Sequence, residues 1–251
     1  MDRALEVMVE AARAAGEVGV KYFQRGLEVT LKADRSPVTQ ADREAEQVIV
    51  EILGRAFPRH GFLGEELGAR GSKDVRWIVD PIDGTRNFVR GIPIWAVLIA
   101  LEEHGEITAG VILNPVSGEL YTARRGKGAF LGGERLRVSE VSSLDKATLV
   151  HASLGLLRQG GHWDGFVRLV DATDRHRGFG DYMCYTVVAA GKAEIAVEAP
   201  DLKPWDLAPL KLLVEEAGGR FTDFAGTPSI YSGTALATNG RLHDAALALL
   251  R

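Results

Sequence analysis

The sequence predicts a layered protein of the α+β or α/β class, in which helices pack against two β-sheets. Three observations support this class. Two amphipathic helical segments precede Pro58, short strands joined by turn residues fill the middle of the chain, and strands alternate with helices after about residue 140. The chain has 251 residues, of which 46% are hydrophobic, so it is long enough for a sizeable core.

The N-terminal segment is expected to be mainly helical. Apolar residues recur at helical spacing and predict one amphipathic helix over residues 2–25. Val29–Leu31 is a strand candidate. Thr39-Gln40-Ala41-Asp42 has the pattern of a capping box, which predicts that a second helix begins here and continues until Pro58 ends it.

The middle of the chain is predicted to be a loop followed by an antiparallel meander. Residues 62–73 are rich in glycine and polar residues, so we expect a loop, and a buried strand follows at Arg76–Val79. The next apolar runs are separated by turn sequences such as Glu-His-Gly-Glu and Pro-Val-Ser-Gly. These runs predict strands at Ile94–Leu101, Ile107–Leu113, Leu120–Ala123 and Ala129–Leu131.

The C-terminal part is predicted to alternate strands and helices. Strands are expected at Thr148–His151, Ala193–Val197, Arg220–Thr222 and Ala235–Thr238. Helices are expected at Trp163–Val170, Tyr185–Ala190, Asp206–Ala217 and the last ten residues. We therefore divide the chain into an N-terminal α+β part, residues 1–139, and a C-terminal α/β part, residues 140–251. No Pro/Ser-rich linker separates them, so we expect one compact unit.

Composition and charge exclude several classes of function. The formal net charge is −4, and the chain has no basic stretch of the kind that binds nucleic acid, so no nucleic-acid partner is expected. No window approaches the ~20 apolar residues of a membrane span, and the N-terminus has no signal-peptide pattern. The single cysteine, Cys184, lies in an apolar helix and is expected in the core. We expect a cytoplasmic protein without membrane contact.

The stretch from Trp77 to Phe88 carries the strongest chemical signal. Asp80 and Asp83 stand three positions apart after an apolar strand, and two carboxylates held close together favour a bound cation. The Ile82 carbonyl between them can add a third oxygen. Gly84-Thr85 offers backbone N–H groups and a hydroxyl that suit a phosphate oxygen. Metal plus phosphate is therefore the chemistry that this stretch favours.

Further carboxylates in other segments make a site for two Mg²⁺ ions plausible. Glu65 lies in a Gly-Glu-Glu sequence and Asp206 stands near the start of a helix, and Mg²⁺ prefers such oxygen ligands. Each residue also has a structural interpretation. Asp206 suits a helix N-cap, Asp42 a capping box, and Glu65-Glu66 a solvated loop.

Taken together, these segments resemble the inositol monophosphatase family. The resemblance rests on Gly64-Glu65-Glu66, on Trp77-Ile78-Val79-Asp80-Pro81-Ile82-Asp83-Gly84-Thr85-Arg86-Asn87-Phe88, and on Trp205-Asp206-Leu207-Ala208. It extends from Val38 to Gly240. It implies a five-layer αβαβα sandwich and a phosphomonoesterase that depends on Mg²⁺, with two or three ions, and is inhibited by Li⁺. It also implies a homodimer.

The resemblance assigns roles to individual residues. It implies metal ligands at Glu65, Asp80, the Ile82 carbonyl, Asp83 and Asp206. It implies catalytic roles for Thr85, Asp42 and Glu65, with Asp42 as the partner acid of Thr85. It implies substrate contacts from Gly84, Thr85, Asp83, Asp181, Glu198 and Asp206. Most ligands then fall in the N-terminal part, and the C-terminal part supplies Asp206 and substrate contacts.

The substrate is a small phosphate ester that the resemblance narrows only in part. Asn87-Phe88 argues against the nucleotide branch, which usually carries Glu at the first position. The segments after Asn87 and around Arg177–Tyr182 resemble the histidinol-phosphatase branch. Histidinol phosphate, which yields histidinol in histidine biosynthesis, is therefore expected ahead of inositol 1-phosphate. A regulatory binding protein of the transcription or ribosome-assembly machinery is the alternative of another class.

Overall fold

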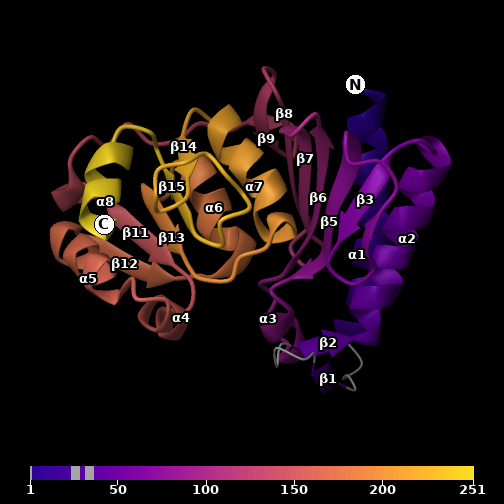
Figure 1. Ribbon diagram of the computed structural model, residues 1–251, viewed down its shortest axis with the longest axis horizontal. Helices are drawn as coiled ribbons and strands as arrows, with labels where there is room; N and C mark the ends of the chain where they lie inside the picture. Colours follow the sequence, from indigo (N-terminus) through magenta and orange to yellow (C-terminus); the bar gives the residue numbers. More distant parts are fainter. Residues whose placement is uncertain (1, 24–28, 32–36) are drawn as a thin grey trace.

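The structure is a computed structural model that describes residues 2–23, 29–31 and 37–251. It has five layers, which follow one another from right to left in Figure 1. An outer pair of helices covers an eight-stranded sheet, a central pair separates this sheet from a five-stranded sheet, and further helices cover the far face. The αβαβα architecture is therefore confirmed.

The first sheet contains the predicted meander. Its strands are β3 (Gly61–Gly64), β4 (Gly68–Arg70), β5 (Val75–Asp83), β6 (Ala96–Glu103), β7 (Glu106–Asn114), β8 (Glu119–Arg124), β9 (Gly128–Leu131) and β10 (Glu134–Arg135). They lie in the order β10-β9-β8-β7-β6-β5-β3-β4. The strands pair antiparallel except for β3 and β5, which are parallel.

The loop predicted at residues 62–73 is wrong for half of its length, because residues 62–64 and 68–70 form strands. β3 pairs with β5 and then turns back into β4, with Phe62 opposite Arg70 and Gly64 opposite Gly68. The side chains of this glycine-rich sequence give little preference for a strand. Backbone hydrogen bonds to neighbouring strands at the edge of the sheet form the strands instead. β5 is also longer than predicted and carries the acidic motif within its last residues.

The second sheet orders its strands β12-β11-β13-β15-β14. They are β11 (Thr148–His151), β12 (Arg175–Gly178), β13 (Ile195–Glu198), β14 (Arg220–Thr222) and β15 (Ala235–Thr238). β12, β11 and β13 run parallel, whereas β15 is antiparallel to its neighbours. β12 was not predicted, because its Arg-His-Arg-Gly sequence is too polar to indicate a strand; it lies at the edge of the sheet.

The outer helices agree with the predictions, and several short elements add to them. α1 (Arg3–Phe23) and α2 (Gln40–Ala56) cover the first sheet, while α4 (Leu154–Gln159), α5 (Trp163–Ala172) and α8 (His243–Leu250) cover the second. Predicted residues 24–25 of the first helix lie outside the described residues. β1 (Val29–Leu31) pairs with β2 (Pro37–Thr39), and α3 (Thr85–Val89) and a 3₁₀ turn (Leu144–Lys146) complete the elements.

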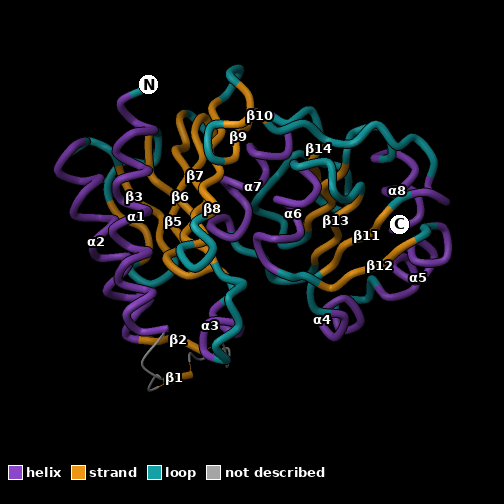
Figure 2. The backbone as a smooth tube through the Cα atoms, turned by 180° about the vertical axis from the view of Figure 1, so that it is seen from behind, coloured by secondary structure: helices purple, strands orange, loops and turns teal. Residues whose placement is uncertain are grey.

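The central helices connect the two sheets through one hydrophobic core. α6 (Asp181–Ala189) and α7 (Pro204–Glu216) lie between the sheets in both views (Figures 1 and 2). Residues 207–214 of α7 are all buried, as expected for a helix that has sheets on both sides. Cys184 is buried within α6, as predicted. None of the helices in the described part of the chain is long and apolar enough to span a membrane.

Strand ends from both sheets meet at one edge of the molecule. The parallel strands β3 and β5 end beside Glu65 and Asp83, and α3 follows β5. β11 leads into α4 at the same edge (Figures 1 and 2). Carboxyl ends of parallel strands are frequent ligand sites, and here the helices α3, α6 and α7 also begin close to that edge.

Candidate active site

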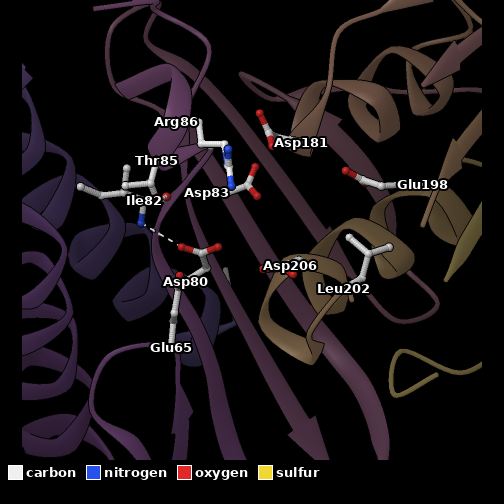
Figure 3. Close-up of a pocket in the computed structure, with 11 residues that line it drawn as sticks. Glu65, Asp80, Ile82, Asp83, Thr85, Arg86, Asp181, Glu198, Leu202 and Asp206 are labelled. Carbon is white, nitrogen blue, oxygen red and sulfur yellow. Dashed lines mark hydrogen bonds between the residues drawn. The ribbon is translucent and has the colours of Figure 1, made fainter. Parts of the chain in front are cut away.

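A cavity of about 230 Å³ lies where these strand ends and helix starts meet. Its lining residues come from the end of β3, the β5–α3 turn, the start of α6, the end of β13 and the start of α7 (Figure 3). They are Glu65, Asp80, Ile82, Asp83, Gly84, Thr85, Arg86, Asp181, Glu198, Leu202 and Asp206. The fold thus brings together all of the sequence-predicted site residues except Asp42.

Three carboxylates form the centre of this cavity. Oxygen atoms of Asp80, Asp83 and Asp206 all lie within 4.8 Å of one another. Asp80 and Asp83 are nearly inaccessible, with 2% and 7% of their surface exposed. Hard oxygen donors gathered at this spacing can hold a divalent cation such as Mg²⁺, so the donor set fits the predicted metal.

Each carboxylate is held in place by a backbone N–H group. Asp80 Oδ1 accepts a hydrogen bond from the Ile82 N–H at 2.9 Å, and Asp83 Oδ2 accepts one from the Tyr182 N–H at 2.7 Å. Asp206 Oδ2 accepts one from the Lys203 N–H at 2.8 Å. Lys203, not Asp206, is therefore the N-cap residue of α7; Asp206 is the third residue of the helix, completes a capping box with Lys203 and also lines the cavity. Asp80 also shares a side-chain hydrogen bond with Glu65, and all three carboxyl groups keep lone pairs that can bind a cation.

The electrostatics of the cavity show an excess of negative charge. Burial raises the pKa of Asp80 well above its usual value, and the nearby charges of Glu65, Asp83 and Asp206 raise it further. Burial and then the charge of Asp181 raise the pKa of Asp83 in the same way. Burial also raises the pKa of Asp206 to about 7. Such a group of like charges favours a bound cation, which removes their mutual repulsion.

The turn after Asp83, where phosphate contact is predicted, requires a glycine. Gly84 has φ +85°, and a Cβ atom there would lie 3.0 Å from the Ile94 carbonyl oxygen and 3.2 Å from Asp181 Oδ2. Both the conformation and the space therefore require glycine. Thr85 begins α3, and its hydroxyl donates a hydrogen bond to the Ile82 carbonyl at 3.0 Å. The Thr85 oxygen keeps lone pairs that can accept a further hydrogen bond.

The predicted substrate acids lie on the opposite side of the cavity from Ile82 and Thr85 (Figure 3). Asp181 Oδ2 accepts a hydrogen bond from Asn87 Nδ2 at 2.9 Å, and burial raises the pKa of Asp181 to about 6. Glu198 Oε2 accepts one from the Tyr185 hydroxyl at 2.9 Å, and burial raises its pKa to about 8. Asp181 and Glu198 thus place two buried carboxyl groups on this side of the cavity, and a nearby cation would favour their ionised forms.

Asp42 and Glu46 are buried on α2 and do not line the cavity. Asp42 is buried in the first turn of the helix, and its partnership with Thr85 stays a prediction. Glu46 was not among the predicted site residues; its carboxylate accepts hydrogen bonds from the N–H groups of Glu66 at 2.7 Å and Leu67 at 3.0 Å. These bonds fix the turn that carries Glu65. An acid four residues after Asp42, beside apolar Ala45, is a signal that could have revealed it.

Comparison with known proteins agrees with this geometry. The model of the inositol monophosphatase family matches residues 1–251. A histidinol-phosphatase of Mycobacterium tuberculosis is 44% identical, with 96% of this chain and 94% of the relative covered. An inositol-1-monophosphatase of Mesorhizobium japonicum is 41% identical, with 97% and 94% covered.

A solved structure shows the same architecture. The extragenic suppressor protein SuhB of Bartonella henselae superimposes with a TM-score of 0.92 at 39% identity, and 99% of this chain and 98% of that chain are covered. Sequence and structure therefore match over nearly their whole lengths. This chain belongs to the inositol monophosphatase family of phosphoric monoester hydrolases.

Proposed function

We propose that this protein hydrolyses a small phosphate monoester with Mg²⁺, and that its substrate is histidinol phosphate. The observation that carries the proposal is the group of three carboxylates within 4.8 Å of one another, beside the Gly84-Thr85 turn. Glu65, Asp80, Asp83, Asp206 and the Ile82 carbonyl would hold the ions. When bound, divalent cations neutralise phosphate charge and lower the pKa of an attacking water.

The side chains around the ions would direct the proton transfers. A water molecule attacks phosphorus and its proton passes to the Thr85 oxygen, while the Thr85 hydroxyl turns from the Ile82 carbonyl and passes its proton to the buried carboxylate of Asp42. The ester P–O bond breaks, and the leaving alkoxide takes up a proton from solvent. The Gly84 and Thr85 N–H groups would hold the phosphate oxygens. No covalent phosphoenzyme is needed.

The choice of histidinol phosphate is supported by the acids on the leaving-group side. Asp181 and Glu198 both line the cavity, and an amine or imidazolium group gains from their charge. Two curated relatives at 42% and 44% identity are named histidinol-phosphatase. Inositol 1-phosphate is the second candidate, because Glu198 can also accept hydrogen bonds from hydroxyl groups and a relative at 41% identity is named inositol-1-monophosphatase.

A binding role is the third candidate and belongs to another class. It is supported by the similarity to a Nus factor SuhB of Xylella fastidiosa, which is 39% identical over 89% of this chain. The intact set of carboxylates argues for catalysis as the main role. We expect a homodimer from the family resemblance, and sedimentation velocity of the purified protein measures it.

A panel of phosphate esters tests the proposal. Purified protein is assayed for inorganic phosphate release from histidinol phosphate, inositol 1-phosphate and glycerol 2-phosphate, with Mg²⁺ and with EDTA. We expect Mg²⁺-dependent release, with kcat/KM at least about tenfold higher for histidinol phosphate than for inositol 1-phosphate. A tenfold preference for inositol 1-phosphate would reverse the order of the two substrates. No release from any ester would contradict the catalytic role and favour the binding role.

A further inference from the structure

A second cavity, of about 400 Å³, continues from the metal-binding cavity. The two share Arg86, Asp181, Glu198 and Leu202 as lining residues. Ala152, Phe179 and Ala199 also line the second cavity, and these residues directly follow the parallel strands β11, β12 and β13. The second cavity therefore lies at the carboxyl ends of three parallel strands, where open sheets usually bind their ligands.

Apolar side chains form the outer wall of this second cavity. Leu156 on α4 is 39% exposed and Phe179, just after β12, is 37% exposed, and both line the cavity. Large apolar side chains that stay exposed around a cavity mark a place where a ligand covers them. Pro200 and Leu202 extend the same wall. A bound group with an apolar face would remove this surface from water.

The inner wall carries charge, with carboxylates in excess. Asp181 and Glu198 line the cavity together with Arg86, so two carboxyl groups stand against one guanidinium, and a cation bound beside them would favour their ionised forms. Asp181 accepts a hydrogen bond from Asn87, and Glu198 accepts from the Tyr185 hydroxyl and the Asp181 N–H, so both carboxyl groups keep lone pairs that can contact a ligand. A cation is favoured there over a neutral or anionic group.

We propose that the second cavity holds the leaving group of the phosphate ester, and that Leu156 and Phe179 determine its specificity. The cavity selects a leaving group that combines a flat or apolar body with a positive charge. A polyol of similar size has hydroxyl groups on all sides and gains nothing from the apolar wall. This inference rests on the proposed function, since the first cavity must hold the phosphate.

Truncation of the two apolar side chains tests the inference. Phe179→Ala and Leu156→Ala are compared with Leu154→Ala, because Leu154 lies on the same helix, is 41% exposed and is not among the residues that line the cavity. The measured quantity is kcat/KM for histidinol phosphate divided by kcat/KM for glycerol 2-phosphate, whose leaving group is small and neutral. Thermal unfolding of each variant verifies that it is folded.

We expect the ratio to fall about fivefold to twentyfold in Phe179→Ala and Leu156→Ala through a higher KM for histidinol phosphate. Leu154→Ala keeps the wild-type ratio, and Phe179→Tyr, which retains the flat ring, keeps most of it. An active enzyme whose ratio is the same in all variants would overturn this inference and leave the proposed function standing. A wild-type protein that releases phosphate from no ester would overturn both.

Discussion

Asp83 joins the metal-binding side of the cavity to the leaving-group side. Its Oδ2 accepts the Tyr182 N–H at the start of α6, and its carboxylate lies within 4.8 Å of Asp80 and Asp206. One side chain therefore holds the helix that presents Asp181 and also contributes to the acidic cluster. Its buried charge is unfavourable in the free protein, as its raised pKa shows. A cation bound in the acidic cluster would stabilise the ionised form of Asp83.

Replacement of Asp83 separates catalysis from stability. We expect Asp83→Asn to lower kcat by at least about 10³-fold at saturating Mg²⁺, because a ligand contact made throughout the reaction is lost. In EDTA the same variant should unfold at or above the wild-type temperature, because a buried like charge has been removed. Asp74→Asn, an exposed change just before β5, is the control. Near-wild-type turnover in Asp83→Asn would refute the metal assignment.

His243 is a buried neutral residue at the start of α8, away from the cavity. Thr222 donates its hydroxyl proton to the Asp223 carbonyl, so it accepts from His243 Nε2–H, and Nδ1 accepts from the Thr238 hydroxyl. Burial, with a contribution from Arg220, lowers the pKa of His243 to about 4. The unfolded chain has the ordinary value of about 6.5, so the neutral form favours the folded state.

The lowered pKa of His243 predicts that the folded protein loses stability in acid. The contribution of His243 is complete above about pH 6.5 and is lost as the pH falls toward 4. Between pH 7.5 and pH 5, the contribution of His243 to the free energy of unfolding should decrease by about 2 kcal/mol. Urea unfolding of wild type and His243→Gln at both pH values measures this contribution. The effects of other titrating groups cancel in the difference between the unfolding free energies of the two proteins. A stability gap between the two proteins that does not change with pH would refute this role.

At the scale of elements, α2 positions the turn between β3 and β4. Glu46 accepts the N–H groups of Glu66 and Leu67, and the Glu65 N–H donates to the Val79 carbonyl of β5 at 3.2 Å. A Cβ atom at Gly64 would clash with the Glu46 carboxylate, so glycine lets the helix approach. The Glu65 side chain is therefore held between a helix and a strand, next to Asp80.

Loss of the Glu46 contacts should weaken metal binding. In Glu46→Gln, one oxygen acceptor becomes an amide donor that cannot bind an N–H group, so the Glu65 turn loosens. We expect the Mg²⁺ concentration for half-maximal activity to rise about tenfold. Glu51→Gln, an exposed change on the same helix, should leave it unchanged. Equal Mg²⁺ requirements in the two variants would show that Glu46 does not position the turn.

The elements also show what the sequence could and could not predict. The meander from β6 to β9 was predictable because apolar runs alternate with strong turn residues. β4 and β12 were missed because pairing at sheet edges forms them, and their own side chains give little signal. α4 was missed as well, since six residues carry too little periodicity.

At the scale of the whole molecule, the cavity depends on both sheets. The first sheet supplies Glu65, Asp80 and Asp83, whereas Asp206 and Glu198 come from the C-terminal part. The local motif could be interpreted from twelve residues, because its carboxylates and glycine turn are adjacent in sequence. Spacing alone could not show that Asp206 lies beside it, since more than 120 residues and a second sheet intervene. The family resemblance provided that link.

The central claim is that the acidic cavity binds Mg²⁺ for the hydrolysis of a phosphate ester. The most direct test is phosphate release from histidinol phosphate by wild-type protein as Mg²⁺ is titrated into a metal-free sample. We predict no release without metal, saturable activation as Mg²⁺ is added, and renewed loss with EDTA. Release that is unchanged by EDTA, or absent at every Mg²⁺ concentration with every ester of the panel, would contradict the account.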